Sequence, residues 1–193
     1  MQTIIANKNV VKKVAPKEGK TIQIGNARLT WKAMGVDTAY GTSLYEMDLA
    51  PGIPVHSHPY AEIYYVISGH VDFLRYDDHD IEEWVRCGPG DTMIAGTNAL
   101  HAFHNRTDKP ARFLSASVYY HEVALEKYGT PVDVNDPAPA NKMPNEAEAN
   151  QYLDVLKDAM SVHMYFPQQN ARNGLEVFRD IENRNKETDV IAR

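Results

Sequence analysis

Short runs of alternating apolar and polar residues fill the first 120 residues of the chain. Glycine, proline, asparagine and aspartate separate these runs, so that a turn signal recurs roughly every 8–12 residues. Alternation with a period of two predicts β-strands, here over residues 21–24, 27–34, 43–49, 62–68, 71–76, 81–86, 92–95, 100–105 and 112–120. No segment before about residue 121 has the spacing of an amphipathic helix. The pattern predicts an all-β sandwich or barrel, and closure into a barrel is favoured because it removes exposed strand edges.

The pattern changes after Tyr120. Residues 123–128 predict a short helix, and the proline-rich residues 129–144 predict a linker that runs over the surface. Asn145 and Glu148 form a predicted capping pair for a helix that continues to about Met160. The residues expected on one face of that helix are Tyr152, Leu153, Leu156, Ala159 and Met160.

An apolar segment, residues 161–167, is expected to pack back onto the barrel, and Leu175, Phe178 and Ile181 predict a final helix. The expected organisation is an N-terminal arm over residues 1–20 and a β-barrel over residues 21–122. A linker and C-terminal helical extension, residues 123–193, would pack on that barrel. Lysines concentrate in the arm, and a solvated terminal segment is the favoured interpretation of this cluster.

Composition and charge narrow the class of protein. A chain of 193 residues with 43% hydrophobic and 24% charged residues is typical of one well-buried globular core. The net charge of −6 argues against a nucleic-acid or anionic-membrane partner. No apolar run is long enough for a signal peptide or a membrane span, so the cytoplasm is the expected compartment. A single cysteine, Cys87, excludes an internal disulfide and any zinc site with two thiolates.

Three candidate metal ligands lie within seven residues: His56, His58 and Glu62. Residues i and i+2 of an extended segment project to the same side, so the two histidines aim together. Glu62, at an even offset, joins them if the strand continues. Imidazole with one carboxylate suits iron, manganese, nickel, copper, cobalt or zinc. Two solvated histidines in a surface loop are the alternative interpretation of the pair alone, and a fourth candidate ligand, His101, favours the metal site.

These residues follow the two motifs of the cupin superfamily, which the sequence resembles. In the first motif, Gly52 precedes His56-Ser57-His58, three residues lead to Glu62, and six more lead to Gly69. In the second, five residues separate Gly90 from Gly96-Thr97-Asn98, followed by His101 and Asn105. The loop after Gly52 is short, and Gly-Thr-Asn replaces the usual Pro-x-Gly turn. Both departures concern turns, and neither removes a ligand.

The resemblance implies a jelly-roll β-barrel that holds one divalent transition metal (Fe, Mn, Ni, Co, Cu or Zn). Its ligands would be His56, His58, Glu62 and His101. A more diffuse resemblance of residues 119–122 and 128–131, and of the segments after them, is to single-domain quercetinase-like cupins. It implies a dioxygenase of a small aromatic or enolic substrate, with Glu62 as a base close to the metal.

Other functions use the same ligand set. A cupin isomerase or lyase would employ the metal as a Lewis acid, with Tyr64 or Glu62 as the catalytic base. A binding or sensor module would hold a small molecule without turnover. A homodimer is expected from the arm, the sheet edges and the family resemblance.

Alternation also selects candidates for the pocket lining. Tyr64 shares the face of Glu62, and Phe103 shares that of His101, so both could contact a substrate or simply belong to the core. Tyr60 is a further candidate at the pocket rim. For the preceding strand, the sequence does not decide whether Glu46 or Met47 faces inward. His104 lies at an odd offset from His101, so it is expected to point to the opposite face and to have a role in the core or beside the ligands. The remaining histidines have no ligand-like neighbours in the sequence and are expected to be structural or exposed: His70, His79, His121 and His163.

Overall fold

The structure is a computed structural model that describes residues 11–25, 27–49, 52–136, 143–186 and 190–191. Most of its strands coincide with the runs of alternating residues. They are β1 (Thr21–Ile24), β2 (Ala27–Ala33), β3 (Ser43–Leu49), β4 (Glu62–Ser68), β5 (Val71–Tyr76), β6 (Glu82–Cys87), β7 (Thr92–Ala95), β8 (Ala102–His104), β9 (Ala111–Ser117), β10 (Thr130–Pro131) and β11 (Val190–Ile191). Residues 1–10 of the expected arm, residues 137–142 of the expected linker and most of the last seven residues lie outside the described residues.

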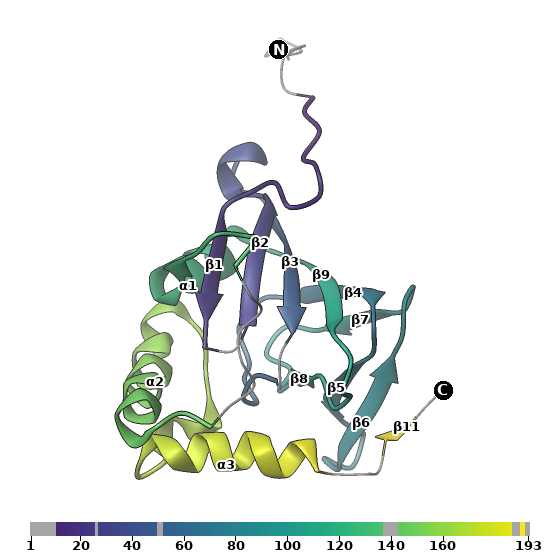
Figure 1. Ribbon diagram of the computed structural model, residues 1–193. Coiled ribbons are helices and arrows are strands. Elements are labelled where there is room, and N and C mark those ends of the chain that lie inside the picture. Colours follow the sequence, from purple (N-terminus) through teal and green to yellow (C-terminus); the bar gives the residue numbers. More distant parts are fainter. Residues whose placement is uncertain (1–10, 26, 50–51, 137–142, 187–189, 192–193) are drawn as a thin grey trace, which may run out of the picture.

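The strands form two sheets (Figure 1). The larger has seven strands in the order β10-β1-β2-β3-β9-β4-β7, and the smaller has four in the order β11-β6-β5-β8. All neighbouring strands of these sheets are antiparallel except the parallel pair β6 and β11. Strand β9 lies between β3 and β4, although the three are distant in sequence, and this places Tyr45, Ser115 and Tyr64 side by side.

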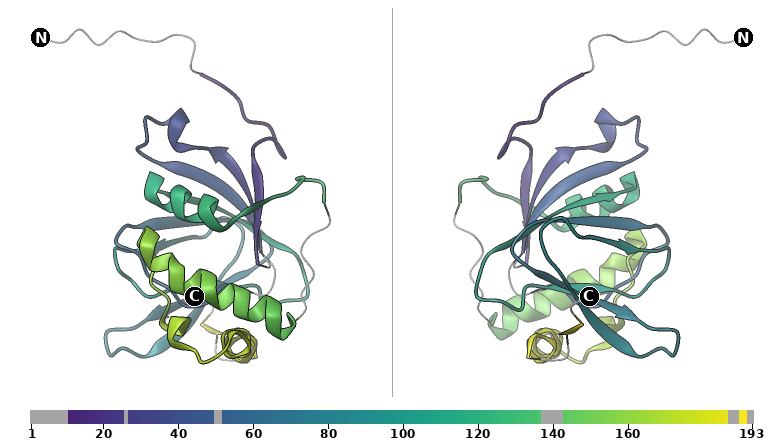
Figure 2. Two further views of the ribbon diagram at one scale, coloured as in Figure 1. Left: turned by 90° about the vertical axis from the view of Figure 1, so that its left-hand side faces the viewer. Right: turned by 90° about the vertical axis from the view of Figure 1, so that its right-hand side faces the viewer.

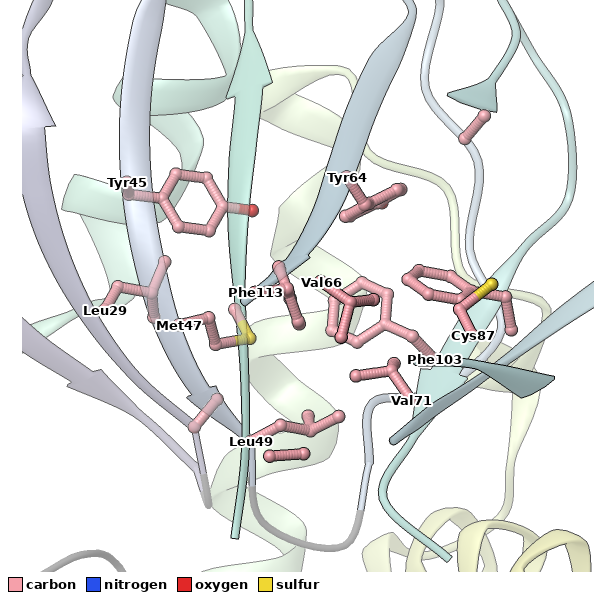
Figure 3. Packing of buried hydrophobic residues seen from close by; sticks show 14 of the residues in the cluster. Leu29, Tyr45, Met47, Leu49, Tyr64, Val66, Val71, Cys87, Phe103 and Phe113 are labelled. Atoms are coloured by element: carbon pink, nitrogen blue, oxygen red, sulfur yellow. The ribbon is translucent and has the colours of Figure 1, made fainter. Parts of the chain in front are cut away.

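Apolar side chains from both sheets fill the space between them (Figure 3). In β3 the inward residues are Tyr45, Met47 and Leu49, while Glu46 is only half-buried. Met47 is therefore the inward residue of the pair that the sequence left open. Phe103 and Phe113 pack edge to face at 4.9 Å between ring centroids in the middle of this core.

The helical part of the chain starts earlier than expected. Helix α1 (Tyr119–Tyr128) directly follows β9, so the prediction of a strand up to Tyr120 is wrong for its last residues. Apolar runs as short as this one do not distinguish strand from helix, and tertiary packing decides. As a helix, the segment buries His121 and Ala124 three residues apart on one face.

Helix α2 (Glu146–Asp158) confirms the capping prediction. The Asn145 side chain accepts a hydrogen bond from the Glu148 N–H, and the Glu148 carboxylate accepts one from the Asn145 N–H. Leu153, Leu156 and Ala159 are buried as expected. The expectation for Met160 is wrong: it lies in a 3₁₀ turn (Ala159–Val162), where the change of period leaves its side chain 57% exposed.

The segment after α2 packs back onto the sheets, as expected. Ser57 and Tyr165 exchange two backbone hydrogen bonds of 2.9 Å, and Phe166 is buried. A second 3₁₀ turn (Pro167–Asn170) leads to helix α3 (Gly174–Asn185), which buries Val177 and Ile181. Helices α1, α2 and α3 thereby cover one side of the two sheets (Figure 2).

Described residues of the arm also contact the body of the protein. Lys12 pairs with Asp37, and Lys20 pairs with Glu126 of α1, which accepts a 2.6 Å hydrogen bond from the Trp31 indole. No helix among the described residues is both long and apolar enough to cross a membrane.

Candidate metal centre

His56 and His101, 45 residues apart in sequence, are joined through their backbones. Each N–H donates to the carbonyl of the other at 2.9 Å, as an isolated antiparallel bridge. The bridge places His101 beside the loop that carries His56 and His58, and β4 begins at Glu62. This backbone pairing therefore brings His101 of the second motif next to His56 and His58 of the first motif.

The four predicted ligand residues converge. One nitrogen of each of His56, His58 and His101 and one oxygen of Glu62 lie within 4.8 Å of one another. All four residues are buried, with 1 to 5% of their surface exposed. Nitrogen and carboxylate ligands lie about 2.0–2.2 Å from zinc, so atoms on opposite sides of one ion are about 4.2 Å apart. The cluster is thus near the size that one metal ion requires.

Hydrogen bonds orient all three imidazoles. The Nδ1 atoms of His56, His58 and His101 lie 3.1, 2.7 and 2.9 Å from the carbonyl oxygens of Pro54, Tyr60 and Ala99. A carbonyl oxygen only accepts, so each Nδ1 carries the proton and each Nε2 presents a lone pair. The Nε2 atoms of His58 and His101 are buried and have no hydrogen-bond partner. Unpaired acceptors that converge in a buried space are compensated when a cation binds between them, so the residues present fit a metal ion.

Burial also shifts the ionisation of the cluster. It holds the pKa of His56 well below its usual range and lowers that of His101, which keeps these imidazoles neutral. Burial alone would raise the pKa of Glu62, but electrostatic attraction from His121 and His58 outweighs it. The pKa of Glu62 is therefore well below its usual range. Neutral imidazoles with an ionised carboxylate are the protonation states that metal binding requires.

Two hydroxyl groups hold one oxygen of Glu62. Tyr45 Oη donates to Oε1 at 2.6 Å, and Ser115 Oγ donates to the same atom. The other oxygen, Oε2, lies 3.3 Å from His58 Nε2. The carboxylate is thereby oriented with one oxygen fixed and the other facing the imidazoles.

His121 is a site residue that the sequence did not reveal, and the expectation that it has no ligand-like neighbours is wrong. It projects from α1, is buried, and places Nε2 at 3.7 Å from Glu62 Oε2 and 3.5 Å from Tyr45 Oη. Burial lowers its pKa to about 4, and its Nδ1 has no hydrogen-bond partner. The signal in the sequence would have been one buried face of a helix, but this segment continues the strand pattern of β9.

His104 lies on the opposite side of its strand from the cluster, as expected from its odd offset to His101. Its ring nitrogens lie 2.7 Å from Asn185 Oδ1 and 3.0 Å from the carbonyl oxygen of Ile53. A Cβ atom on Gly52, whose φ is 135°, would lie 2.2 Å from the His104 ring. The first glycine of the motif thus allows His104 to pack beside the ligand loop.

A cavity of about 80 Å³ adjoins the cluster between the larger sheet and the helical extension. Its wall includes His56, Glu62, His121 and Phe103. A second cavity, of about 180 Å³, is lined by His101 and Tyr64 together with residues of β5 and β7. The expected lining residue Phe103 therefore borders the first cavity and Tyr64 the second.

Tyr60 borders neither of these two cavities. Its ring stacks on His58 at 4.3 Å between centroids, and its hydroxyl is buried without a hydrogen-bond partner. Burial raises the pKa of Tyr60 and of Tyr64, so both phenols stay protonated at neutral pH.

Comparison with known proteins places a family match over the same region. Residues 45–117 match the family model Cupin_2, described as a cupin domain. No curated protein matches the chain. Among solved structures, a predicted oxalate decarboxylase from Thermotoga maritima has 20% identity over 55% of this chain and 98% of its own, with a TM-score of 0.48.

A cupin-like protein from Thermotoga maritima has 17% identity, covering 62% of this chain and 84% of that one, with a TM-score of 0.44. The polyketide cyclase RemF from Streptomyces resistomycificus has 17% identity, covering 78% of this chain and 94% of its own, with a TM-score of 0.44.

Proposed function

We propose that this chain, whose residues 45–117 match the model of a cupin domain, is a metal-dependent dioxygenase of a small aromatic or enolic molecule. The observation that carries the proposal is the convergence of His56, His58, Glu62 and His101 in a buried cluster beside an apolar cavity. Within the proposal the two sheets are the halves of a jelly-roll barrel of the quercetinase-like type. A homodimer in the cytoplasm is part of the same hypothesis.

The four residues would hold one divalent transition metal, since imidazole with one carboxylate suits several such ions. When bound, the metal would polarise a substrate oxygen and, if redox-active, supply electrons to dioxygen. The hydrogen bonds from Nδ1 to backbone carbonyls would keep the three imidazoles aimed at it.

Glu62 is the proposed proton acceptor. It is ionised at neutral pH, and Oε2 is the oxygen that Tyr45 and Ser115 leave free. An enol or phenol hydroxyl at this position would transfer its proton to Oε2, leaving the substrate as an oxyanion. The apolar wall of the cavity would keep bulk water away from that anion.

Burial raises the pKa of Tyr64, so its phenol stays protonated at neutral pH and is proposed as a hydrogen-bond donor to the substrate oxyanion, not as the base. Its hydroxyl is buried and has no hydrogen-bond partner. The ionised Glu62 also allows a second candidate function, a metal-dependent isomerase or lyase, in which the carboxylate removes a proton from one position of the substrate and returns it to another. A binding module without turnover is the third candidate.

Metal content is the first test. We expect the purified protein to contain about one transition-metal ion per chain by elemental analysis, and His101→Ala to lose most of it. The matched control is His79→Ala, which removes an exposed histidine. Absence of stoichiometric metal in the wild type, or equal metal content in His101→Ala, would refute the metalloenzyme proposal.

Dioxygen consumption is the second test, with catechols, flavonols and diketones on protein loaded in turn with iron, manganese and nickel. Substrate-dependent dioxygen uptake supports the dioxygenase. Product formation without uptake would assign the isomerase or lyase instead, and ligand binding without either would assign the binding module.

A further inference from the structure

The helical extension supplies half of the wall of the cavity beside the cluster. Ten of its twenty lining residues come from the sheets and the loop that carries His56 and His58, and ten come from α1, α2 and the segment up to Phe166. Phe166 stacks on His56 at 5.4 Å between ring centroids, so the extension reaches the candidate metal ligands directly. The arrangement of these helices against β1 and β2 is visible in Figure 1.

The polar groups of the lining gather at one end. Glu62, His56, His121 and Tyr45 belong to the cluster or contact it, and the opposite part of the wall is mostly aliphatic and aromatic. No lysine, arginine or aspartate is among the described residues that line this cavity. The Tyr128 hydroxyl donates to Asp158 at 3.0 Å, so this phenol already has its partner.

This lining excludes substrates with a second charged group. A carboxylate or phosphate placed away from the cluster would be removed from water without a counter-ion, which is strongly unfavourable. Several hydroxyl groups, as in a sugar, would also lack partners along the aliphatic wall.

Size gives the second restriction. A dry cavity of 150 Å³ in another protein holds one benzene molecule, and this one measures about 80 Å³. A phenyl substituent therefore does not fit in this cavity, the one that Glu62 borders, beside an enol group held at the cluster.

We infer that the substrate is a short aliphatic enolisable carbonyl compound with no charge other than the one it acquires by losing its enol proton. The helical extension selects it, with Leu156 and Ala159 as specificity-determining wall residues. This inference rests on the proposed function, since it takes the cluster as the place where the substrate oxygen binds. Of the aromatic and enolic classes in that proposal, it selects the enolic one.

Calorimetric titration of zinc-loaded protein tests the inference, because zinc is redox-inert and no turnover disturbs the titration. Three probes are compared: acetylacetone, the charged analogue acetoacetate, and the aromatic analogue benzoylacetone. We expect acetylacetone to bind, and each of the other two to bind at least about tenfold more weakly. Equal or tighter binding of acetoacetate or benzoylacetone, or no binding of acetylacetone, would overturn the inference.

Wall variants assign the selection to the extension. Ala159→Val narrows the cavity and should weaken acetylacetone binding several-fold, whereas Leu156→Ala widens it and should selectively improve benzoylacetone binding. Met160→Val is the matched control, because the Met160 side chain beside Ala159 is exposed. If Leu156→Ala does not fold, the inference is still tested by Ala159→Val and by the titrations of the three probes into the wild-type protein. An unchanged acetylacetone affinity in folded Ala159→Val would refute the proposal that the helical extension selects the substrate.

The outcome is separable from that of the proposed function. Discrimination among the three probes without dioxygen consumption on the iron, manganese and nickel forms would refute the dioxygenase and leave the substrate class standing. If the protein consumes dioxygen but binds the three probes equally well, the dioxygenase proposal stands and the inferred substrate class is refuted.

Discussion

Replacing Tyr45 with phenylalanine removes one hydroxyl from the centre and little else. Tyr45 Oη donates to Glu62 Oε1 at 2.6 Å, a length typical of a hydrogen bond to an ionised carboxylate. The phenyl ring would keep the edge-to-face contact with Trp31, at 5.3 Å between centroids, and the stacking on His121 at 6.0 Å. Ser115 would remain as the other donor to Oε1.

The expected loss follows from the chemistry of that bond. A hydrogen bond to a charged group contributes about 1.5–3 kcal/mol, and Glu62 is fully buried, so water cannot replace the donor. For a chain of this size, the melting temperature of metal-free protein should fall by about 3–12 °C. Metal affinity, measured by competition with a chelating dye, should fall by about 10–100-fold, because Glu62 loses a group that orients it.

The pH dependence of stability is an independent test of the hydrogen bond between Tyr45 and Glu62. Glu62 has a depressed pKa in the folded protein, so its ionisation stabilises the fold above its unfolded value of 4.5, and this contribution disappears as the pH falls through the folded pKa. Tyr45→Phe should raise the folded pKa, so its acid transition should begin at a higher pH than that of the wild type.

Tyr65→Phe is the matched control, since it removes the same hydroxyl from the exposed side of β4. Its melting temperature and metal affinity should equal those of the wild type. If Tyr45→Phe also shifts the melting temperature by less than about 1 °C and metal affinity by less than about threefold, the hydrogen bond does not support Glu62 and the reasoning fails.

Two further predictions concern His121 and Gly52. Burial lowers the pKa of His121 from 6.5 to about 4, so the unfolded chain takes up its proton first and stability is lost as the pH falls between these values. Urea titrations of metal-free His121→Gln should show a smaller loss of the free energy of unfolding over this range, and a loss equal to the wild type would contradict the assignment. Gly52→Ala should lower the free energy of unfolding by at least about 1–3 kcal/mol, because φ is 135° and the new Cβ would lie 2.2 Å from the His104 ring. Gly96→Ala, with no heavy atom within 4 Å of its Cβ position, should change it by less than about 0.5 kcal/mol, and similar values for both would refute the steric argument.

Local chain geometry determined the features that the sequence predicted well. Strand positions followed from alternation over four to seven residues, and the start of α2 from the reciprocal hydrogen bonds of Asn145 and Glu148. The convergence of His56, His58 and Glu62 was predictable because an extended backbone fixes where side chains at even offsets point. His101 was predictable only from the spacing of a second motif, since its proximity depends on a backbone bridge between distant segments.

Tertiary structure alone decided the rest. Tyr45 and Ser115 reach Glu62 because β9 pairs with both β3 and β4, a register that no local pattern contains. His121 enters the site only because residues 119–128 form a helix that packs on the sheets, where the alternation of β9 suggested more strand. The cavity likewise exists only after the helical extension covers the sheets, and its wall is divided evenly between them. Periodicity and turn chemistry act within about ten residues, whereas pairing and packing join residues far apart in the chain. A single sequence therefore predicts the candidate ligands but not their surroundings.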